Sequence, residues 1–292
     1  MPSGYTSLNE YNLQKYGCKV YKLSINAGFS CPNRDGTLGT RGCIFCSENG
    51  SGEFAASGND ILIQLENAKQ RVEHKNKSGK YIAYFQSFTN TYAPTEILRE
   101  KYLKAIQPAY IVGISIATRS DCLGKEVIDL LKEINKIKSV TVELGLQTAN
   151  EQTAYFIRRG YKNDVYQKAV NDLKAAGIEV VTHIILGLPG ETEADMLGTT
   201  RFAVEAGTDG VKFHTLYVTR GTDLAEEYQK GAFRCLELDE YADILKKCIA
   251  LLPRRVVVHR ITGDGKKGDL IAPKWTENKK MVLNFLNNAL NH

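Results

Sequence analysis

The sequence lacks any run of apolar residues close to the roughly 18 that a membrane-spanning helix needs. Its first segment, MPSGYTSLNEYNLQKYG, is polar and has no apolar core of the kind found in secretory signal peptides. Internal repeats of fixed period and low-complexity tracts are also absent from the sequence. We therefore expect a cytoplasmic globular protein that does not associate with a membrane.

A strong excess of one charge sign is missing as well. Lys and Arg number 38 against 33 Asp and Glu, so the formal net charge is only +5, and the basic residues are scattered. This surplus permits a polyanionic partner without requiring one. With 292 residues, the chain is long enough to bury a large core without disulfides and to form one or two domains.

After residue 20, short runs rich in Val, Ile, Tyr and Phe alternate with helical apolar stripes. The pattern predicts strands at 22–27, 81–88, 110–117, 140–147, 179–186 and 211–218, with a late strand at 255–261. It predicts helices at 60–72, 125–137, 239–252 and 276–290. Two further helices are expected to start at an Asn163 N-cap and at a Thr192 capping motif.

Six strands that are each followed by a helix imply parallel β-α-β units with right-handed crossovers. Such units close as a barrel or open as a doubly wound sheet. No G-x-G-x-x-G follows a strand, which weakens the dinucleotide-binding option. A weak boundary near 220–222 predicts a core over 1–218, with an N-terminal extension over 1–20, and a C-terminal extension over 219–292.

The cysteines are the most informative residues. Seven cysteines without an export signal favour a metal or catalytic role over disulfides. Cys31, Cys43 and Cys46 form C-x11-C-x2-C directly after the first strand, where active-site loops of parallel barrels lie. Three thiolates can bind three corners of an iron–sulfur cubane and leave its fourth iron open. The alternative is a zinc site completed by Cys18.

Several stretches of the sequence match those of a known family, in the same order and over almost the whole chain. The matching stretches are YNLQKYGCKVYKLSINAGFSCPNRDG, GCIFC, YFQSFTNTYAP, IATRSD, ELGLQT, RRGY, THIILGLPGET, KFHTLYVTRGT and HRITGDG. In these the chain resembles radical S-adenosylmethionine (SAM) enzymes, and more closely the bacterial YhcC/YtqA group, relatives of the Elongator catalytic subunit. The long first cysteine gap departs from the usual C-x3-C-x2-C but is what this branch shows.

The resemblance implies an α/β fold with a partial (β/α)6 TIM-type barrel and a small C-terminal α/β extension. It implies a [4Fe-4S] cluster on Cys31, Cys43 and Cys46, with SAM on the open iron as the source of a 5′-deoxyadenosyl radical. An acetyltransferase domain like that of the Elongator subunit is not expected in a chain of this length. The remaining cysteines are interpreted as packing residues: Cys122, Cys235 and Cys248.

The SAM site is expected at the strand ends. The resemblance implies contacts from Gln86 and Ser87 after the second strand, from Arg159, and from the turn at Gly187. Phe45 either packs on the adenine or plugs the cysteine loop. We predict that Ser87, Gln147 and Arg159 in particular bind SAM.

The two-residue period of strands places further polar residues inside the barrel. Glu143, Gly145 and Gln147 share a face, and buried polar groups there need partners. A ribose or methionyl group would supply them, or a network with Arg158 or Arg159. His183 is expected at the same SAM site, with a satisfied core histidine as the alternative.

Lys212 and His214 share a face of the sixth strand, and Arg119 follows the third. Ionisable residues beside a SAM site are candidates for substrate contact and catalysis. The alternatives are that Lys212 snorkels to the rim and that Arg119 pairs locally with Asp121. Residues of the late strand and its loop face the same mouth in this interpretation: Arg260 and Asp264.

The relationship to Elongator suggests tRNA as the substrate, at uridine 34. For YtqA-like members it implies conversion of 5-carboxymethylaminomethyl(-2-thio)uridine to 5-aminomethyl(-2-thio)uridine, with an electron donor of the flavodoxin or ferredoxin type. Lys212, Arg119 or Arg260 would contact the substrate carboxylate. Expected RNA contacts are Arg34, Arg41, Lys266, Lys267, Lys274, Lys279, Lys280, Tyr92, Tyr161 and Trp275. The alternatives are a radical SAM enzyme acting on a small metabolite or peptide, and a non-enzymatic Fe–S or zinc RNA-binding module.

Overall fold

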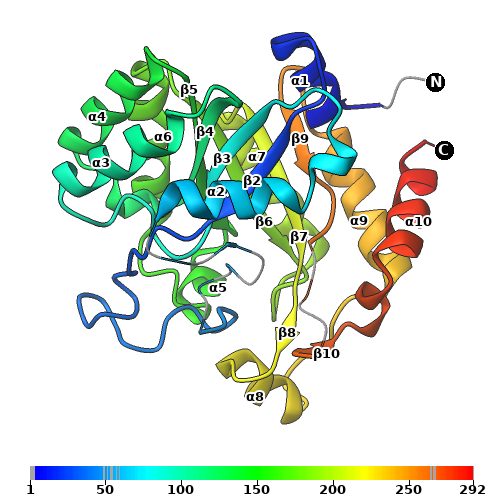
Figure 1. Cartoon of the computed structure of the whole chain (residues 1–292). Coiled ribbons are helices and arrows are strands. Elements are labelled where there is room, and N and C mark those ends of the chain that lie inside the picture. The colour runs from blue at the N-terminus through cyan, green and yellow to red at the C-terminus, as the bar shows by residue number, and fades with distance from the viewer. Residues whose placement is uncertain are drawn as a thin grey trace.

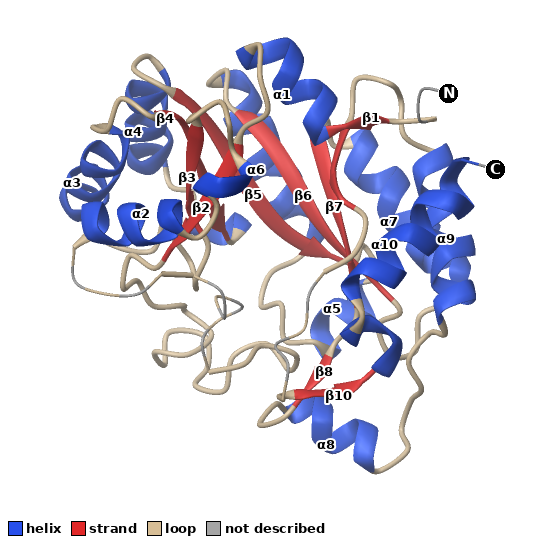
Figure 2. Cartoon of the chain, turned by 45° about the vertical axis from the view of Figure 1, so that its right-hand side comes forward, coloured by secondary structure: helices blue, strands red, loops and turns tan. Residues whose placement is uncertain are grey.

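The computed structural model describes residues 4–48, 50, 52, 55–56, 58, 60–263, 265 and 268–291. Its centre is one curved parallel sheet of eight strands in the order β1-β9-β7-β6-β5-β4-β3-β2 (Figures 1 and 2). The strands are β1 (Thr6–Ser7), β2 (Tyr21–Ile25), β3 (Tyr81–Phe85), β4 (Ile111–Thr118), β5 (Ser139–Gln147), β6 (Glu179–Leu186), β7 (Gly210–Thr215) and β9 (Val257–Arg260). The predicted α/β half-barrel is therefore confirmed.

The helices are α1 (Leu8–Tyr16), α2 (Ile61–Gln70), α3 (Thr95–Ile106), α4 (Lys125–Asn135), α5 (Glu151–Phe156), α6 (Asn163–Ala175), α7 (Glu193–Glu205), α8 (Asp223–Gln229), α9 (Leu238–Ala250) and α10 (Lys279–Asn291). Most of them cover the outer face of the sheet, whereas α5 and α8 lie beyond the carboxyl ends of its strands (Figure 1). Within the described residues, no helix combines the length and apolar character that crossing a membrane requires.

Two predictions about helix starts have different outcomes. Thr192 forms the expected capping box with Asp195 at the start of α7. Asn163 does not cap α6, because it is the first helical residue and Lys162 is the N-cap. The Asn163 amide instead donates to the carbonyl of Ala149 at 2.7 Å and accepts from Arg159 at 3.0 Å. Its side chain is therefore committed to the turn after β5.

The strand expected at 211–218 is wrong in one respect, because it is two strands. β7 ends at Thr215, and β8 (Val218–Thr219) pairs antiparallel with β10 (Leu270–Ala272) in a separate two-stranded sheet. Leu216 and Val218 are buried in a second hydrophobic cluster that also includes Ile44 and Leu224. Burial in this cluster, rather than against the main sheet, explains the apolar pattern of the segment.

The late strand, β9, lies beside β7 in the main sheet, and β1 pairs with β9. The sheet is therefore wider than the six predicted strands. This pairing sets Lys212 opposite Arg260, which brings the late segment to the barrel interior.

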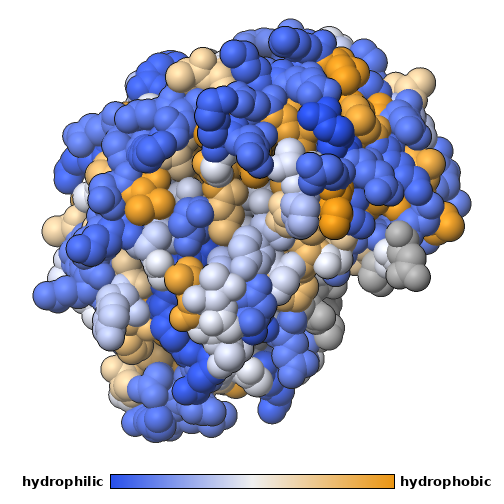
Figure 3. Space-filling model, turned by 90° about the vertical axis from the view of Figure 1, so that its left-hand side faces the viewer, coloured by the Kyte–Doolittle hydropathy of each residue, from blue (hydrophilic) through white to orange (hydrophobic). Residues whose placement is uncertain are grey.

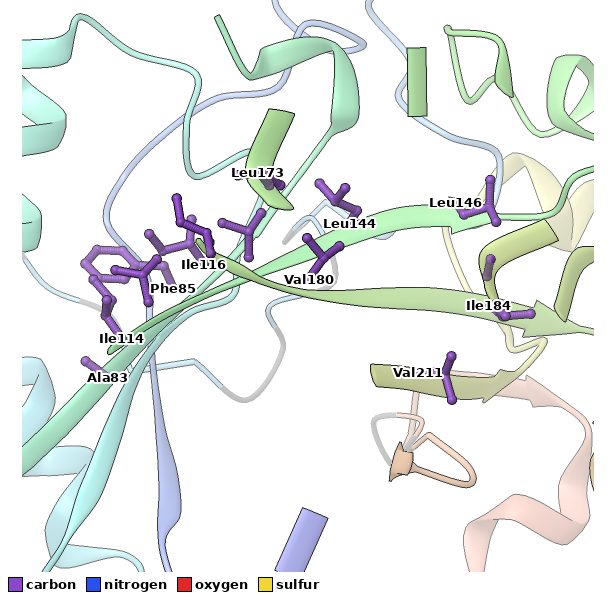
Figure 4. Packing of buried hydrophobic residues seen from close by; sticks show 14 of the residues in the cluster. Ala83, Phe85, Ile114, Ile116, Leu144, Leu146, Leu173, Val180, Ile184 and Val211 are labelled. Carbon is purple, nitrogen blue, oxygen red and sulfur yellow. The ribbon is translucent and has the colours of Figure 1, made fainter. Parts of the chain in front are cut away.

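The strands alternate their side chains between the two faces of the sheet. Residues such as Ile114, Leu144 and Val180 point into the layer between sheet and helices, where Leu173 of α6 meets them (Figure 4). The view of the molecular surface in Figure 3 is mostly hydrophilic with scattered apolar residues, as expected of amphipathic covering helices. The opposite side-chain set faces the barrel interior, and that set builds the site.

Candidate active site

A cavity of about 460 Å³ opens inside the half-barrel at the carboxyl ends of the strands. Interior residues of three strands line it: Glu143, Gly145 and Gln147 of β5, His183 and Ile185 of β6, and Lys212 and His214 of β7. The face assignments drawn from the two-residue period are therefore confirmed. Gly187 lies just beyond β6 with φ +90°, and a Cβ there would come within 3.0 Å of Leu236.

The cysteine segment reaches the same cavity. Cys31, Cys43 and Cys46 all line it. Hydrogen bonds shape their loop: the Arg34 guanidinium donates to the Ser47 carbonyl at 2.5 Å and to the Cys46 carbonyl at 3.2 Å. Gly42 has φ +73°, and a Cβ there would lie 2.9 Å from Arg34 Nε. Arg34, expected to contact RNA, thus also holds the cysteine loop.

The surroundings of Cys43 favour its thiolate form. A hydrogen bond with Cys46 lowers the pKa of the Cys43 thiol to about 6 against the opposing effect of burial, with smaller contributions from Arg119, Asn33 and Arg34. Asn33 also donates to Cys43 Sγ at 3.4 Å. Metals and clusters bind the thiolate, so this environment suits a cluster ligand.

Cys18 lies at the other end of β2. It follows α1 and donates to the Tyr16 carbonyl at 3.5 Å, whereas Cys31 comes after the strand. Five strand residues separate the two positions by about 16 Å. α1 and the cysteine loop lie at opposite ends of the sheet in Figure 1. Among the described residues, no three Cys, His, Asp or Glu side chains are grouped closely enough to hold one metal ion.

Most of the residues expected to bind SAM line the cavity, but Ser87 and Gly187 are not among its lining residues. Phe45 and Gln86 line it, and Phe45 also packs on the second hydrophobic cluster. Ser87 is 1% exposed, and its Oγ has no hydrogen-bond partner among the described residues. Phe88 and Gln147 both line the cavity, and their backbones adopt the left-handed conformation, with φ of 61° and 59°. Strained non-glycine backbone of this kind gathers at functional sites.

Two expected arginines already have protein partners. Arg159 is 2% exposed and donates to the carbonyls of Thr148 at 2.7 Å, Tyr161 at 2.8 Å and Leu146 at 3.2 Å, although it also borders the cavity. Arg119 forms two hydrogen bonds with Asp121, at 2.9 and 2.7 Å, which is the local ion pair considered as its alternative. Both side chains stiffen turns at the cavity rim.

Glu143 is the hub of the cavity floor. Its side chain is 0% exposed and contacts the ammonium groups of both Lys22 and Lys212. Ser115 Oγ donates to it at 2.6 Å, and His183 Nε2 lies 2.7 Å from its second oxygen. The network with Arg158 or Arg159 that we considered is therefore wrong. Lys212 is 5% exposed, so the snorkelling alternative is also wrong.

Burial and charge set the protonation of this hub. Burial alone would raise the pKa of Glu143, but Lys212 and Lys22 hold it well below its usual value. Burial lowers the pKa of Lys212 to about 7, against the attraction of Glu143. Burial likewise lowers the pKa of His183 to about 4 and that of His214 well below its usual range, so both imidazoles are neutral at pH 7.

Sequence reasoning missed Lys22. A lysine inside the buried strand sequence Tyr-Lys-Leu-Ser-Ile is a signal, since a strand interior rarely admits an unpaired charge. Its partner Glu143 lies 121 positions away along the chain. The alternation pattern alone therefore could not show that Lys22 points into the barrel interior or that it contacts Glu143.

The residues predicted to contact RNA lie in different parts of the structure. Tyr161 is partly buried and lines the cavity, its hydroxyl donating to the Gly145 carbonyl at 2.5 Å, and the Trp275 indole donates to the Leu236 carbonyl at 2.9 Å. Arg41 is exposed and pairs with Asp223. Asp264, Lys266 and Lys267 lie outside the described residues.

Comparison with known proteins identifies the family. The Radical SAM superfamily matches residues 36–203, and the Radical_SAM C-terminal domain matches 208–292. The Bacillus subtilis (strain 168) protein YtqA is 44% identical over 287 residues, covering 98% of this chain and 89% of YtqA.

Two more distant proteins extend the comparison. A Methanocaldococcus jannaschii tRNA uridine(34) acetyltransferase is 29% identical over 156 residues, covering 52% of this chain and 28% of that protein. The fold resembles that of archaeal Methanocaldococcus infernus Elp3, with a TM-score of 0.70 at 17% identity, covering 92% of this chain and 63% of the other. With its three-cysteine loop opening into a half-barrel cavity, the chain belongs to the radical SAM superfamily, enzymes that use a [4Fe-4S] cluster and SAM.

Proposed function

We propose that this enzyme modifies the wobble uridine of tRNA, converting 5-carboxymethylaminomethyl(-2-thio)uridine to 5-aminomethyl(-2-thio)uridine. The observation that carries the proposal is the single cavity that joins the cysteine loop to a cationic floor around Lys212. Similarity to a tRNA uridine(34) acetyltransferase supports the choice of tRNA and of the modified position. A tRNA substrate also favours the cytoplasm as the location.

The residues present fit the two cofactors. Cys31, Cys43 and Cys46 would hold the cluster, since all three border one cavity and Cys43 readily deprotonates. Gln86 and Gln147 border the same space and would contact SAM. When bound and reduced by a flavodoxin- or ferredoxin-type donor, the cluster and SAM supply a 5′-deoxyadenosyl radical for hydrogen abstraction.

The net reaction balances with SAM as the oxidant. The CH2–NH unit of the substrate loses two electrons and two hydrogens, one from the carbon and one from the nitrogen, while the sulfonium carbon–sulfur bond is cleaved to methionine and 5′-deoxyadenosine. One water supplies the oxygen of glyoxylate as the carbon–nitrogen bond breaks and the amine is released. The enzyme's own contribution is to orient the carboxymethyl group, and Lys212 and Arg260 border the cavity where it would enter.

An exposed aromatic ring on the same side of the barrel suits an anticodon loop. Tyr155 is 87% exposed in α5, which follows β5 and lies at the carboxyl end of the sheet (Figure 1). Splayed bases stack on such rings. Replacing Tyr155 with Ala should weaken tRNA binding, whereas Ile137→Ala, at a 58% exposed site beyond α4, serves as the matched control.

The test is turnover of defined tRNA. Anaerobically reconstituted enzyme, SAM and dithionite are incubated with tRNA that carries the carboxymethylaminomethyl group, and the nucleosides are analysed by mass spectrometry. We expect the aminomethyl product together with glyoxylate and 5′-deoxyadenosine. The Cys43→Ala variant is the control without a complete cluster site.

Failure to convert the tRNA, with intact SAM cleavage, would contradict the proposal and favour action on a small metabolite or peptide. Equal turnover of the free nucleoside would argue against tRNA recognition. The non-enzymatic RNA-binding alternative is wrong, because the chain belongs to a superfamily of enzymes.

A further inference from the structure

Two lysines at the cavity floor share one carboxylate. The Lys22 and Lys212 ammonium groups both contact Glu143, and both lie over the ring of Tyr84, 4.9 and 4.5 Å from its centroid. Lys212 Nζ also lies 3.3 Å from the Tyr84 hydroxyl. Arg260 stands opposite Lys212 across β7 and β9 and borders the same cavity.

The other groups that face Lys212 do not balance this charge. Burial lowers the pKa of the imidazoles on β6, β7 and β9, so they are neutral at pH 7: His183, His214 and His259. Burial, followed by the charge of Glu143, raises the pKa of Tyr84. Ser115 is uncharged. Asp269 also lines the cavity, but the ion pairs of Lys22 and Lys212 are both with Glu143, so two cations share that one carboxylate and Arg260 lies beside them.

Such a surplus is costly in a site shielded from water, unless a further anion joins it. Two other arginines near the cavity have their own carboxylates: Arg119 pairs with Asp121, and Arg158 pairs with Asp223. Arg34 and Arg220 line the cavity as well and donate to backbone carbonyls. For Arg260, no ion pair occurs with any carboxylate in the part of the chain that the structure describes. The cavity floor therefore brings together three cations, Lys22, Lys212 and Arg260, of which two share the Glu143 carboxylate.

We propose that these three cations form a carboxylate-binding subsite that holds the anionic end of the substrate. Lys212 comes three residues before the end of β7, so the subsite lies about 10 Å inward from the strand ends that carry the cysteine loop. A carboxylate on an extended side chain can reach this floor, while its reacting carbon stays nearer the cysteines. This inference rests on the proposed function for the identity of the substrate, but not for the chemistry of the subsite.

The test compares two tRNAs that differ only in this group. Dissociation constants are measured for tRNA bearing 5-carboxymethylaminomethyl-2-thiouridine and for tRNA bearing 5-aminomethyl-2-thiouridine, using the reconstituted enzyme with SAM. The variants are Lys212→Gln and Arg260→Gln. Lys15→Gln is the matched control, because Lys15 pairs with Glu179 at the opposite end of the sheet. The dissociation constant of SAM is measured for every variant.

We expect the enzyme to prefer the carboxylate-bearing tRNA by roughly tenfold or more, the strength of a hydrogen bond to a charged group. Lys212→Gln and Arg260→Gln should lose this preference and keep the affinity for SAM, and Lys15→Gln should change neither. Arg260 is only partly buried, so its variant remains informative if Lys212→Gln folds poorly.

Two results would overturn the assignment. If the variants bind SAM more weakly and keep the tRNA preference, the three cations hold the carboxylate of SAM rather than that of the substrate. If the dissociation constants of both ligands are unchanged, the three cations bind no carboxylate.

Failure of the proposed function can be told apart from failure of the subsite. If neither tRNA binds better than an unmodified transcript, the subsite is probed with N-methylglycine by saturation-transfer NMR. A signal that Lys212→Gln abolishes would support the subsite, and equal signals in both proteins would overturn it.

Discussion

Replacing Glu143 with Gln tests the charge arrangement of the cavity floor. The substitution keeps the volume of the side chain but leaves the ammonium groups of Lys22 and Lys212 without their carboxylate. Because the Glu143 side chain is 0% exposed, little solvent replaces it. Removing one partner of a buried ion pair costs about 3–5 kcal/mol.

This cost converts to a shift in melting temperature. An unfolding entropy of about 2.1 cal/mol/K per residue gives roughly 0.6 kcal/mol/K for a chain of this length, so we expect a loss of about 5–8 °C. The assay is calorimetry of the protein without cofactors at pH 7. Glu179→Gln is the control, since Glu179 pairs with Lys15 at a site 32% exposed, where an ion pair contributes about 1 kcal/mol or less.

The deficit should also depend on pH. Burial lowers the pKa of Lys212 to about 7, while unfolded lysine titrates near 10.4. Folded Lys212 is protonated below pH 7 and mostly neutral above it, so stability rises with pH between these values. The Glu143→Gln deficit should therefore be larger at pH 6 than at pH 8, and Lys212→Met in the same chain should recover part of it. A loss no larger than that of Glu179→Gln would refute the reasoning.

Four further outcomes are expected. Single Ala variants of Cys31, Cys43 and Cys46 should lose reconstituted iron and SAM cleavage, measured by iron analysis and chromatography. Cys18→Ala should retain both the iron and SAM cleavage. Arg159→Ala should lower the melting temperature, because the guanidinium bonds three carbonyls; unchanged stability with lost SAM binding would mean that it serves the ligand alone. The preference for carboxylate-bearing tRNA should decline as pH rises through about 7 and Lys212 loses its proton, and a flat profile would contradict this role. The Lys266/Lys267 double Ala variant should weaken tRNA binding and its salt dependence without affecting uncoupled SAM cleavage; salt-independent binding would argue against phosphate contacts.

The site could be anticipated only in part. The period of two correctly put Glu143, Gly145 and Gln147 on one interior face, because alternation is a property of each strand by itself. It could not show that Lys22 reaches Glu143, because that contact depends on how far the sheet curves. For the same reason, the sequence could not show that Tyr161, expected as an RNA contact, lines the cavity and donates its hydroxyl hydrogen to the Gly145 carbonyl.

The sequence by itself determined the alternation of strands and helices, the capping of α7 and the loop that carries three cysteines. These features depend on neighbouring residues and on short-range hydrogen bonds. The tertiary structure alone decided that β9 joins the main sheet beside β7, and that Lys22, Lys212 and Arg260 gather near a single buried carboxylate. Such pairings are fixed by sheet register and curvature, which bring distant segments together and leave no periodic trace in the sequence.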